Sequence, residues 1–265
     1  KTCFLILLLY ILTPRLFGDA FYNDRDALFV SLLWISLLAF EGYRHKPGIV
    51  TAILCAFFFA LSINTRFFGL ILLFLPMIRI LRSGEKKTAI WLLFLTFAFW
   101  YLITPVFWGN FPQEFLAAFR LFSSGQQRTQ ETAGMAQILF LGKRFYENDL
   151  PFCYLPLWIL ISTPLIPQML CLTGIICTVR KKRNRTDLFM LCFLLGGIST
   201  VMLIRPVLSN GWRHFYFFYV PFFWFAAAGL NALINHHVKI IQMGAAAIVC
   251  LSAIRTVNRI TTLHP

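Results

Sequence analysis

The chain has 265 residues, of which 59% are hydrophobic and 13% are charged, and its mean hydropathy is +0.74. This composition excludes an ordinary soluble globular domain and indicates an integral membrane protein. The formal net charge of +14 would also suit a nucleic-acid-binding protein, but the densest basic cluster, residues 180–185, directly follows an apolar run, so membrane topology explains it better and no nucleic-acid partner is expected.

Apolar runs near the ~20 residues that cross a bilayer as a helix follow one another along the chain. They cover residues 3–12, 27–43, 48–64, 67–81, 88–108, 152–179, 188–204, 215–234 and 240–254. We therefore expect an all-α fold, a polytopic transmembrane helix bundle with about eight full spans. The first run is about half a membrane thick and the chain begins at Lys1, so we expect a clipped first span in a fragment of a longer protein. No repeat or linker divides the sequence, which predicts a single transmembrane domain over residues 1–265.

The basic residues predict how the spans are oriented. If the spans alternate, the basic segments fall on one side, which the positive-inside rule makes the cytoplasm. These are Lys1, residues 43–46, 82–87 and 180–185, and Lys239. The opposite side then receives residues 14–26, the turn at 64–66, residues 205–214 and a loop over about 109–151. Within that loop, residues 113–122 have apolar positions at helical spacing, which predicts an amphipathic helix on the bilayer surface.

One outer segment, "PRLFGDAFYNDRDALF", concentrates five charges between apolar runs and is a candidate polar site. The five are Arg15, Asp19, Asp24, Arg25 and Asp26. A structural alternative is that Asp19 and Asp24 cap helix ends while the arginines reach lipid headgroups. Asp26 directly precedes the apolar run 27–43, which predicts a carboxylate in the first turn of a membrane helix. There it could act as a general base, pair with an arginine, or bind a divalent ion together with Asp24.

The same segment resembles the outer-loop signature of bacterial membrane glycosyltransferases of the GT-C superfamily, which includes the protein O-mannosyltransferases and the aminoarabinose transferases of lipid A. The matching positions are Pro14, Arg15, Phe21, Asn23, Arg25 and Asp26. Two further stretches are similar to motifs of that family. "LSINTRFFGLILL" at 61–73 resembles its Thr-Arg-x-x-Gly-Leu turn, and "NGWRHFYFFYVPFFWFAAAGL" at 210–230 resembles its Arg-His turn leading into a Pro-containing helix.

The resemblance implies an enzyme of a bacterial inner membrane that moves a sugar from a polyprenyl-phosphate donor to a lipid, glycan or protein acceptor on the extracytoplasmic side. The expected catalytic residues are Asp26 and Asp24, and the residues expected to bind the donor phosphate are Arg66, Arg213, His214 and Arg15. A guanidinium can bond two phosphate oxygens and a histidine can donate a further hydrogen bond. No cofactor is assigned; a divalent cation is left open, with Asp24 and Asp26 as its ligands if one is bound. The acidic residue commonly assigned as base in this family lies in an earlier outer loop, which would precede Lys1.

Other functions remain open at this stage. A transporter or flippase of lipid-linked glycans would line a pathway with the same outer charges, but transporters usually bury ionisable groups near the bilayer midplane, often on broken helices. The predicted spans carry almost no charge at mid-depth, which favours an enzyme at the membrane surface. A glycan polymerase or ligase would share the donor and the side of the membrane, and a non-catalytic assembly subunit is a further alternative. The sugar and the acceptor are not predicted.

Overall fold

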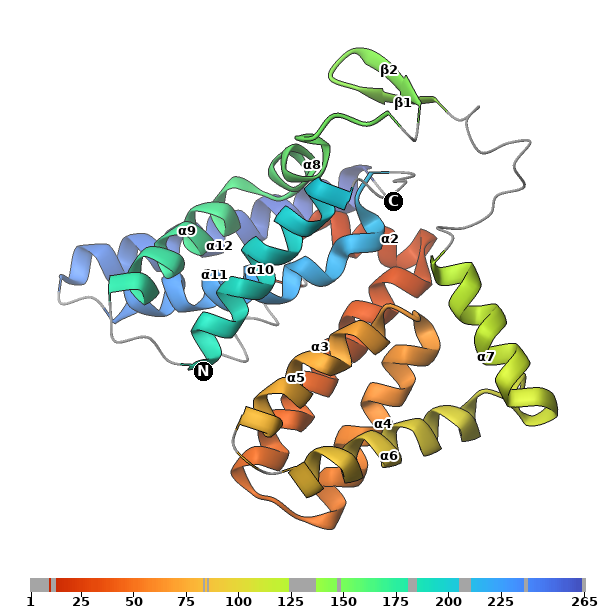
Figure 1. Ribbon diagram of the computed structural model, residues 1–265. Helices are drawn as coiled ribbons and strands as arrows, with labels where there is room; N and C mark the ends of the chain where they lie inside the picture. The colour runs from red at the N-terminus through yellow and green to blue at the C-terminus, as the bar shows by residue number, and fades with distance from the viewer. Residues whose placement is uncertain are drawn as a thin grey trace. The chain divides into compact units, whose positions relative to one another are not determined.

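The structure is a computed structural model that describes Tyr10 and residues 13–82, 84, 86–123, 137–146, 149–180, 185–204, 211–235 and 238–263 (Figure 1). The elements are α2 (Pro14–Tyr22), α3 (Asp24–His45), α4 (Ile49–Thr65), α5 (Gly69–Arg82), α6 (Lys86–Ile103), α7 (Phe107–Ser123), β1 (Gln137–Phe140), β2 (Lys143–Tyr146), α8 (Tyr154–Ser162), α9 (Leu165–Arg180), α10 (Arg185–Ile204), the 3₁₀ helix η1 (Arg213–Phe218), α11 (Tyr219–Ile234) and α12 (Lys239–Leu263). Within these ranges the two short strands are the only regular structure other than helix, so the expected all-α class is confirmed.

Several helices have the length and composition of membrane spans. Within the described ranges these are the segments Arg25–His45, Lys86–Ile103, Thr186–Leu203 and Arg213–Ile234, and the bent pair α8 and α9 would make a fifth. Each coincides with an apolar run that predicts a span. Helix α4 is also apolar but has 17 residues. The total of about eight spans stays a prediction, and most of the first run, residues 3–12, lies outside the described residues.

The apolar run at 152–179 is not one continuous helix. The chain bends by 115° between α8 and α9, with Thr163 in extended geometry and Pro164 directly after it. Proline lacks a backbone N–H and disfavours helical geometry at the preceding residue, which explains the break. The side chain of Gln168 then donates to the backbone oxygens of Leu160 and Thr163, at 2.7 Å in both cases, and so satisfies carbonyls that the end of α8 leaves unpaired.

Residues 14–26, expected as an outer loop, contain the nine-residue helix α2. Pro14 suits the first helical position because its fixed φ is already helical. Arg15 and Asp19 lie one turn apart and form an ion pair, which supports a short helix. The helix ends at Asn23, whose N–H bonds the Asp19 carbonyl at 2.7 Å. Asp19 therefore lies inside the helix, and the alternative that it caps a helix end is wrong.

The expected outer loop at 109–151 contains more structure than its composition suggests. The predicted helix at 113–122 is confirmed within α7, which is kinked at Asn110, two residues before Pro112. Its position on a bilayer surface stays a prediction. Strands β1 and β2 form an antiparallel hairpin further along this loop. The polar stretch between them and α7 lies outside the described residues.

The chain divides into two compact units, which are described separately. The first unit comprises residues 1–24 and 134–265, and the second comprises residues 25–133. The single transmembrane domain over residues 1–265 stays a prediction.

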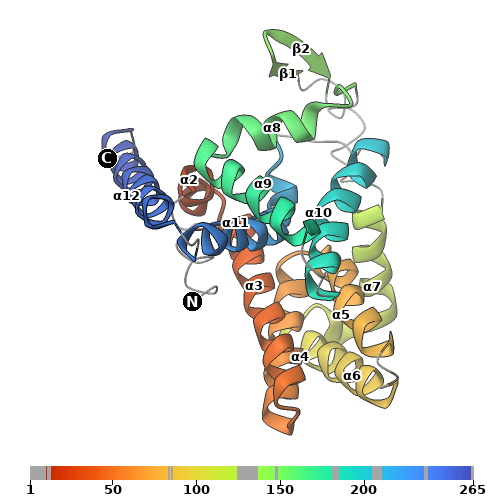
Figure 2. The ribbon, with the colours of Figure 1, turned by 90° about the vertical axis from the view of Figure 1, so that its left-hand side faces the viewer.

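In the first unit α11 is the central helix, and it packs along α9 and against α10 and α12 (Figures 1 and 2). The backbones of α9 and α11 touch where two glycines meet. A Cβ atom added to Gly174 would lie 1.9 Å from the carbonyl oxygen of Phe225, and one added to Gly229 would lie 2.0 Å from that of Leu170. Small residues permit such close approach between membrane helices, so these two positions set the spacing of the pair.

The second unit is built on α4, which packs against α5 and α6. Its core is rich in aromatic side chains, among them the buried Phe59 and Trp100. A polar contact joins α3 to α4, because the hydroxyls of Ser36 and Ser62 lie 3.1 Å apart and both residues are fully buried. Each hydroxyl also lies within hydrogen-bond distance of a carbonyl oxygen of its own helix, at 2.7 Å for Ser36 and 3.0 Å for Ser62, so both protons of this buried pair have an acceptor.

Candidate functional site

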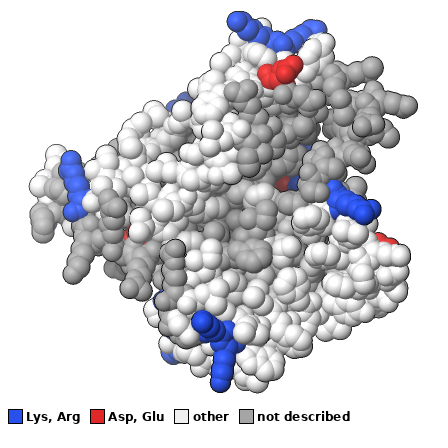
Figure 3. Space-filling model, viewed as in Figure 1, with Lys and Arg blue, Asp and Glu red and all other residues white. Residues whose placement is uncertain are grey.

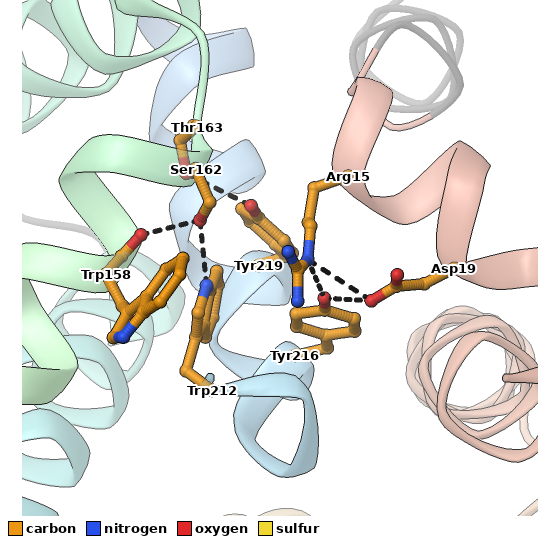
Figure 4. A network of polar contacts seen from close by, with 8 residues as sticks. All are labelled: Arg15, Asp19, Trp158, Ser162, Thr163, Trp212, Tyr216 and Tyr219. Carbon is orange, nitrogen blue, oxygen red and sulfur yellow. Dashed lines mark hydrogen bonds and ion pairs between the residues drawn. The ribbon is translucent and has the colours of Figure 1, made fainter. Parts of the chain in front are cut away.

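The most extensive polar network in the described part of the first unit surrounds Arg15 (Figure 4). The Nε of Arg15 donates to the hydroxyl of Tyr216 at 2.7 Å and lies 3.3 Å from Oδ2 of Asp19. The Tyr216 hydroxyl in turn donates to the same Asp19 oxygen. Since arginine can only donate and an ionised carboxylate can only accept, the single Tyr216 proton must point at Asp19. Arginine, tyrosine and aspartate thus form a closed triangle of contacts.

This triangle fixes Arg15 by one edge of its guanidinium. In the described part of the chain, neither of its Nη nitrogens makes a hydrogen bond, and Figure 4 shows no contact drawn to them. Burial of the guanidinium lowers the pKa of Arg15, but the hydrogen bond to Tyr216 and the charge of Asp19 outweigh this effect and the pKa is raised. Arg15 therefore stays charged at any working pH. The two Nη nitrogens of this charged guanidinium can therefore donate hydrogen bonds to an anion.

An aromatic ring and a glycine lie next to the guanidinium of Arg15. Its guanidinium carbon lies 5.9 Å from the ring centroid of Trp158, within the range of a cation–π contact. Gly211 adjoins both groups, because a Cβ atom there would lie 3.5 Å from an Nη nitrogen of Arg15 and 3.9 Å from a ring carbon of Trp158. Gly211 also has φ of +79°, a conformation that favours glycine. Gly211 thus leaves the space next to the Nη nitrogen open.

The network continues from Tyr216 to the broken span. Trp212 packs edge-on against both Tyr216 and Tyr219, with ring centroids 5.0 and 4.6 Å apart respectively. The indole N–H of Trp212 donates to the Ser162 hydroxyl at 2.8 Å, and the hydroxyls of Thr163 and Tyr219 lie 3.1 Å apart. Ser162 and Thr163 are the residues at which α8 ends. The break between α8 and α9 is therefore joined to the segment that holds Arg15.

A second ionic contact lies within the second unit. Arg66, at the end of α4, donates through an Nη nitrogen to the carboxylate of Asp26, in the first turn of α3. The Asp26 side chain is 3% exposed and the Arg66 side chain 26%. The two residues are 40 positions apart, and both were expected in the site from separate motifs. A carboxylate buried to this degree needs a charged or hydrogen-bonded partner, which Arg66 supplies.

The structure gives fewer contacts for the other expected site residues. Arg213 and His214 open η1, and both are partly buried and in contact with other groups. Asp24 is the first residue of α3, but its side chain lies outside the described part of the structure. Among the residues that the structure describes, no three His, Cys, Asp or Glu side chains gather as a metal site would require. The role of a divalent cation stays open.

Tyr216 is the important residue that sequence reasoning missed. Beyond His214, the aromatic segment 215–224 has no role in the site expected from the sequence, because phenylalanine predominates there and packing explains phenylalanine. A signal was present, however. Tyr216 and Tyr219 carry hydroxyls within an otherwise apolar run, and a buried tyrosine hydroxyl usually finds a polar partner.

No protein-family model, curated protein or solved structure matches this chain. The motifs quoted above are therefore the whole basis of the family resemblance.

Proposed function

We propose that the protein is a membrane glycosyltransferase of GT-C-like architecture that takes a sugar from a polyprenyl-phosphate donor and passes it to an acceptor on the extracytoplasmic side of the membrane. The proposal includes the bundle of about eight spans and the orientation predicted from the basic residues. Its active site would face outward from a bacterial inner membrane. The acceptor could be a lipid, a glycan or a protein.

The proposal rests on the hydrogen bonding of the Arg15 guanidinium. An arginine is held through Nε by Tyr216 and Asp19, while its Nη nitrogens make no hydrogen bond to the described residues. Arginine frequently binds carboxylates and phosphates through two nitrogens at once. In Arg15 the two Nη nitrogens are available for such a contact with another anion. In a chain dominated by apolar helices, the phosphate of a lipid carrier is an anion that reaches such a position without leaving the membrane surface.

The reaction needs a base for the acceptor and cations for the departing lipid phosphate. In the proposed scheme the catalytic residues are Asp26 and Asp24, and the cations that bind the phosphate are Arg15, Arg66, Arg213 and His214. The pairing of Asp26 with Arg66 supports this scheme, since two of these residues meet although they come from different motifs. The described contacts also suit a narrower role, in which Asp26 orients Arg66.

The direct test is transfer of a radiolabelled sugar from a panel of polyprenyl-phosphate donors in membranes that carry the full-length protein. Membranes without the protein serve as the blank. Transfer above that blank from one donor supports the proposal and identifies the sugar. Failure with every donor, at confirmed membrane abundance, contradicts it.

Replacing Tyr216 with phenylalanine should raise the KM for the donor by at least about tenfold, because a hydrogen bond to a charged group is worth about 1.5–3 kcal/mol. The variant keeps the ring and loses only the hydroxyl that orients Arg15. We expect kcat to change less than KM, which steady-state kinetics over a range of donor concentrations would resolve. Tyr22→Phe is the matched control, since Tyr22 is 83% exposed. Equal KM values for wild type and Tyr216→Phe would remove Arg15 from donor binding.

A transporter or flippase is a second candidate, and one observation favours it. The break between α8 and α9 carries the polar side chains of Thr163 and Gln168 on an apolar helix pair, and broken membrane helices often line substrate sites in transporters. Translocation of a fluorescent lipid-linked sugar across proteoliposomes would distinguish the two. Translocation without any sugar transfer would favour the transporter.

A further inference from the structure

The hairpin β1–β2 packs on the start of α8 through one of its faces. In the antiparallel register, Ile138 pairs with Phe145 and Phe140 pairs with Lys143 on this face. The buried Phe140 ring lies 4.8 Å from the ring of Tyr154 and 6.4 Å from that of Trp158, centroid to centroid. Figures 1 and 2 both show the hairpin above α8. The hairpin is thus attached to the first two turns of an apolar helix.

The depth of the hairpin relative to a bilayer follows from its hydrogen bonding. A two-stranded sheet leaves the outer edges of both strands unpaired, and such edges do not occur in the hydrocarbon region, where no water can satisfy them. Helix α8, by contrast, belongs to the bent pair that has the composition of a span. A span formed by α8 and α9 therefore places the hairpin outside the hydrocarbon region, next to the point where the span leaves it.

The opposite face and the turn expose apolar side chains beside basic ones. On the opposite face Leu139, which is 66% exposed, pairs with the exposed Arg144. Leu141, which is 67% exposed, lies in the turn, and Lys143 directly after the turn is exposed although it shares the face of Phe140. Figure 3 shows blue basic atoms where Figure 1 draws the hairpin, next to an acidic group. Leu141 lies in the turn, Lys143 follows the turn, and Leu139 and Arg144 pair one position further along the strands, so these four side chains gather at the turn end of the hairpin, which we call its tip.

Leu141 is an unusual residue for its position. Both turn residues have positive φ, +50° at Leu141 and +78° at Gly142, as a tight two-residue hairpin turn requires. Glycine, asparagine and aspartate suit that conformation, whereas a leucine is uncommon there. An exposed leucine gains nothing from packing within the chain. Its presence suits a partner outside the chain that offers an apolar environment.

We infer that this hairpin tip, defined by Leu139, Leu141, Lys143 and Arg144, is a membrane-surface anchor that docks on anionic lipid headgroups. Lys143 and Arg144 bind headgroup phosphates, and the leucines enter the acyl boundary beneath them. Interfacial segments combine the same two features, basic side chains for anionic lipid and large apolar side chains for the boundary. The inference does not depend on the reaction that the protein catalyses.

The test places the photo-reactive residue benzoylphenylalanine at Leu141 in the full chain and reconstitutes the protein in lipid discs of phosphatidylcholine, with and without phosphatidylglycerol. Irradiation followed by mass spectrometry measures the yield of lipid adduct. The same probe at Gln137, exposed on the same hairpin but at its base, is the matched control. A probe at Leu139 repeats the measurement should substitution of the turn disturb the hairpin.

We expect a lipid adduct from the tip positions that exceeds the adduct from Gln137 and is higher with phosphatidylglycerol. Combining the probe with Lys143→Gln and Arg144→Gln should reduce the yield by about fivefold or more, as expected when two basic residues lose their attraction to an anionic surface. Equal yields at the tip and at Gln137 would overturn the inference. A tip yield unaffected by both charge neutralisation and lipid charge would do the same.

Discussion

Replacing Gly174 with alanine is expected to destabilise the first unit by more than about 3 kcal/mol, the upper end of the usual cost of adding a methyl group to a packed core. The new Cβ would lie 1.9 Å from the carbonyl oxygen of Phe225. This atom belongs to the backbone of α11 and cannot move aside as a flexible side chain would, so α9 and α11 must separate. The midpoint of thermal unfolding in detergent, followed by circular dichroism, would measure the loss.

The matched control is Gly196→Ala on α10, where no atom lies within 4 Å of the added Cβ. Alanine is a better helix former than glycine by about 1 kcal/mol, so this variant should be as stable as the wild type or more stable. Similar unfolding midpoints for the two variants would contradict the close approach of α9 and α11. Gly229→Ala, whose Cβ would lie 2.0 Å from the Leu170 carbonyl oxygen, should behave like Gly174→Ala.

Replacing Asp26 with asparagine is expected to reduce sugar transfer by at least about a hundredfold, the usual lower limit for loss of a general base. Replacing Arg66 with alanine should destabilise the second unit by about 3–5 kcal/mol, because it removes the arginine that pairs with the buried Asp26 carboxylate. Transfer activity at matched membrane abundance measures the first effect. Thermal unfolding measures the second.

Exchanging the two charges separates a catalytic role of Asp26 from a structural one. The double variant Asp26→Arg with Arg66→Asp keeps an ion pair in place but moves the carboxylate to the end of α4. If Asp26 acts in catalysis, the exchange should recover stability relative to Arg66→Ala while transfer stays low. Recovery of transfer as well would show that only the pair matters. The exposed pair of Glu41 and Arg44 is the control, since exchange there should alter stability by no more than about 1 kcal/mol.

Part of the candidate site could be predicted because it depends on short segments. Asp26 was expected in the first turn of a membrane helix, and it lies in the first turn of α3. That prediction needs only a carboxylate directly before an apolar run of the right length. Arg66 was expected at a turn between two helices and lies at the end of α4, for the same local reason.

The contacts between these residues were not predictable in the same way. Asp26 could have paired with any of several arginines, and only the packing of α3 beside α4 selects Arg66, 40 residues away. Arg15 bonds Tyr216 across 201 residues, a contact that no local pattern indicates. The break at Thr163 was missed because hydropathy summed over a window does not register a proline within a stretch that is apolar on average.

The sequence by itself determined that the fold is all-α and apolar, where most helices lie and which charged residues stand between them. These properties depend on how each side chain partitions between water and an apolar phase, which is a sum over local residues. Only the tertiary structure decided which charges are paired and through which nitrogen Arg15 is bound. It also decided that the backbones of α9 and α11 touch at Gly174 and Gly229. These depend on the shapes of side chains that are distant in the sequence, because close packing allows each helix pair only the separation and the polar contacts that its facing residues permit.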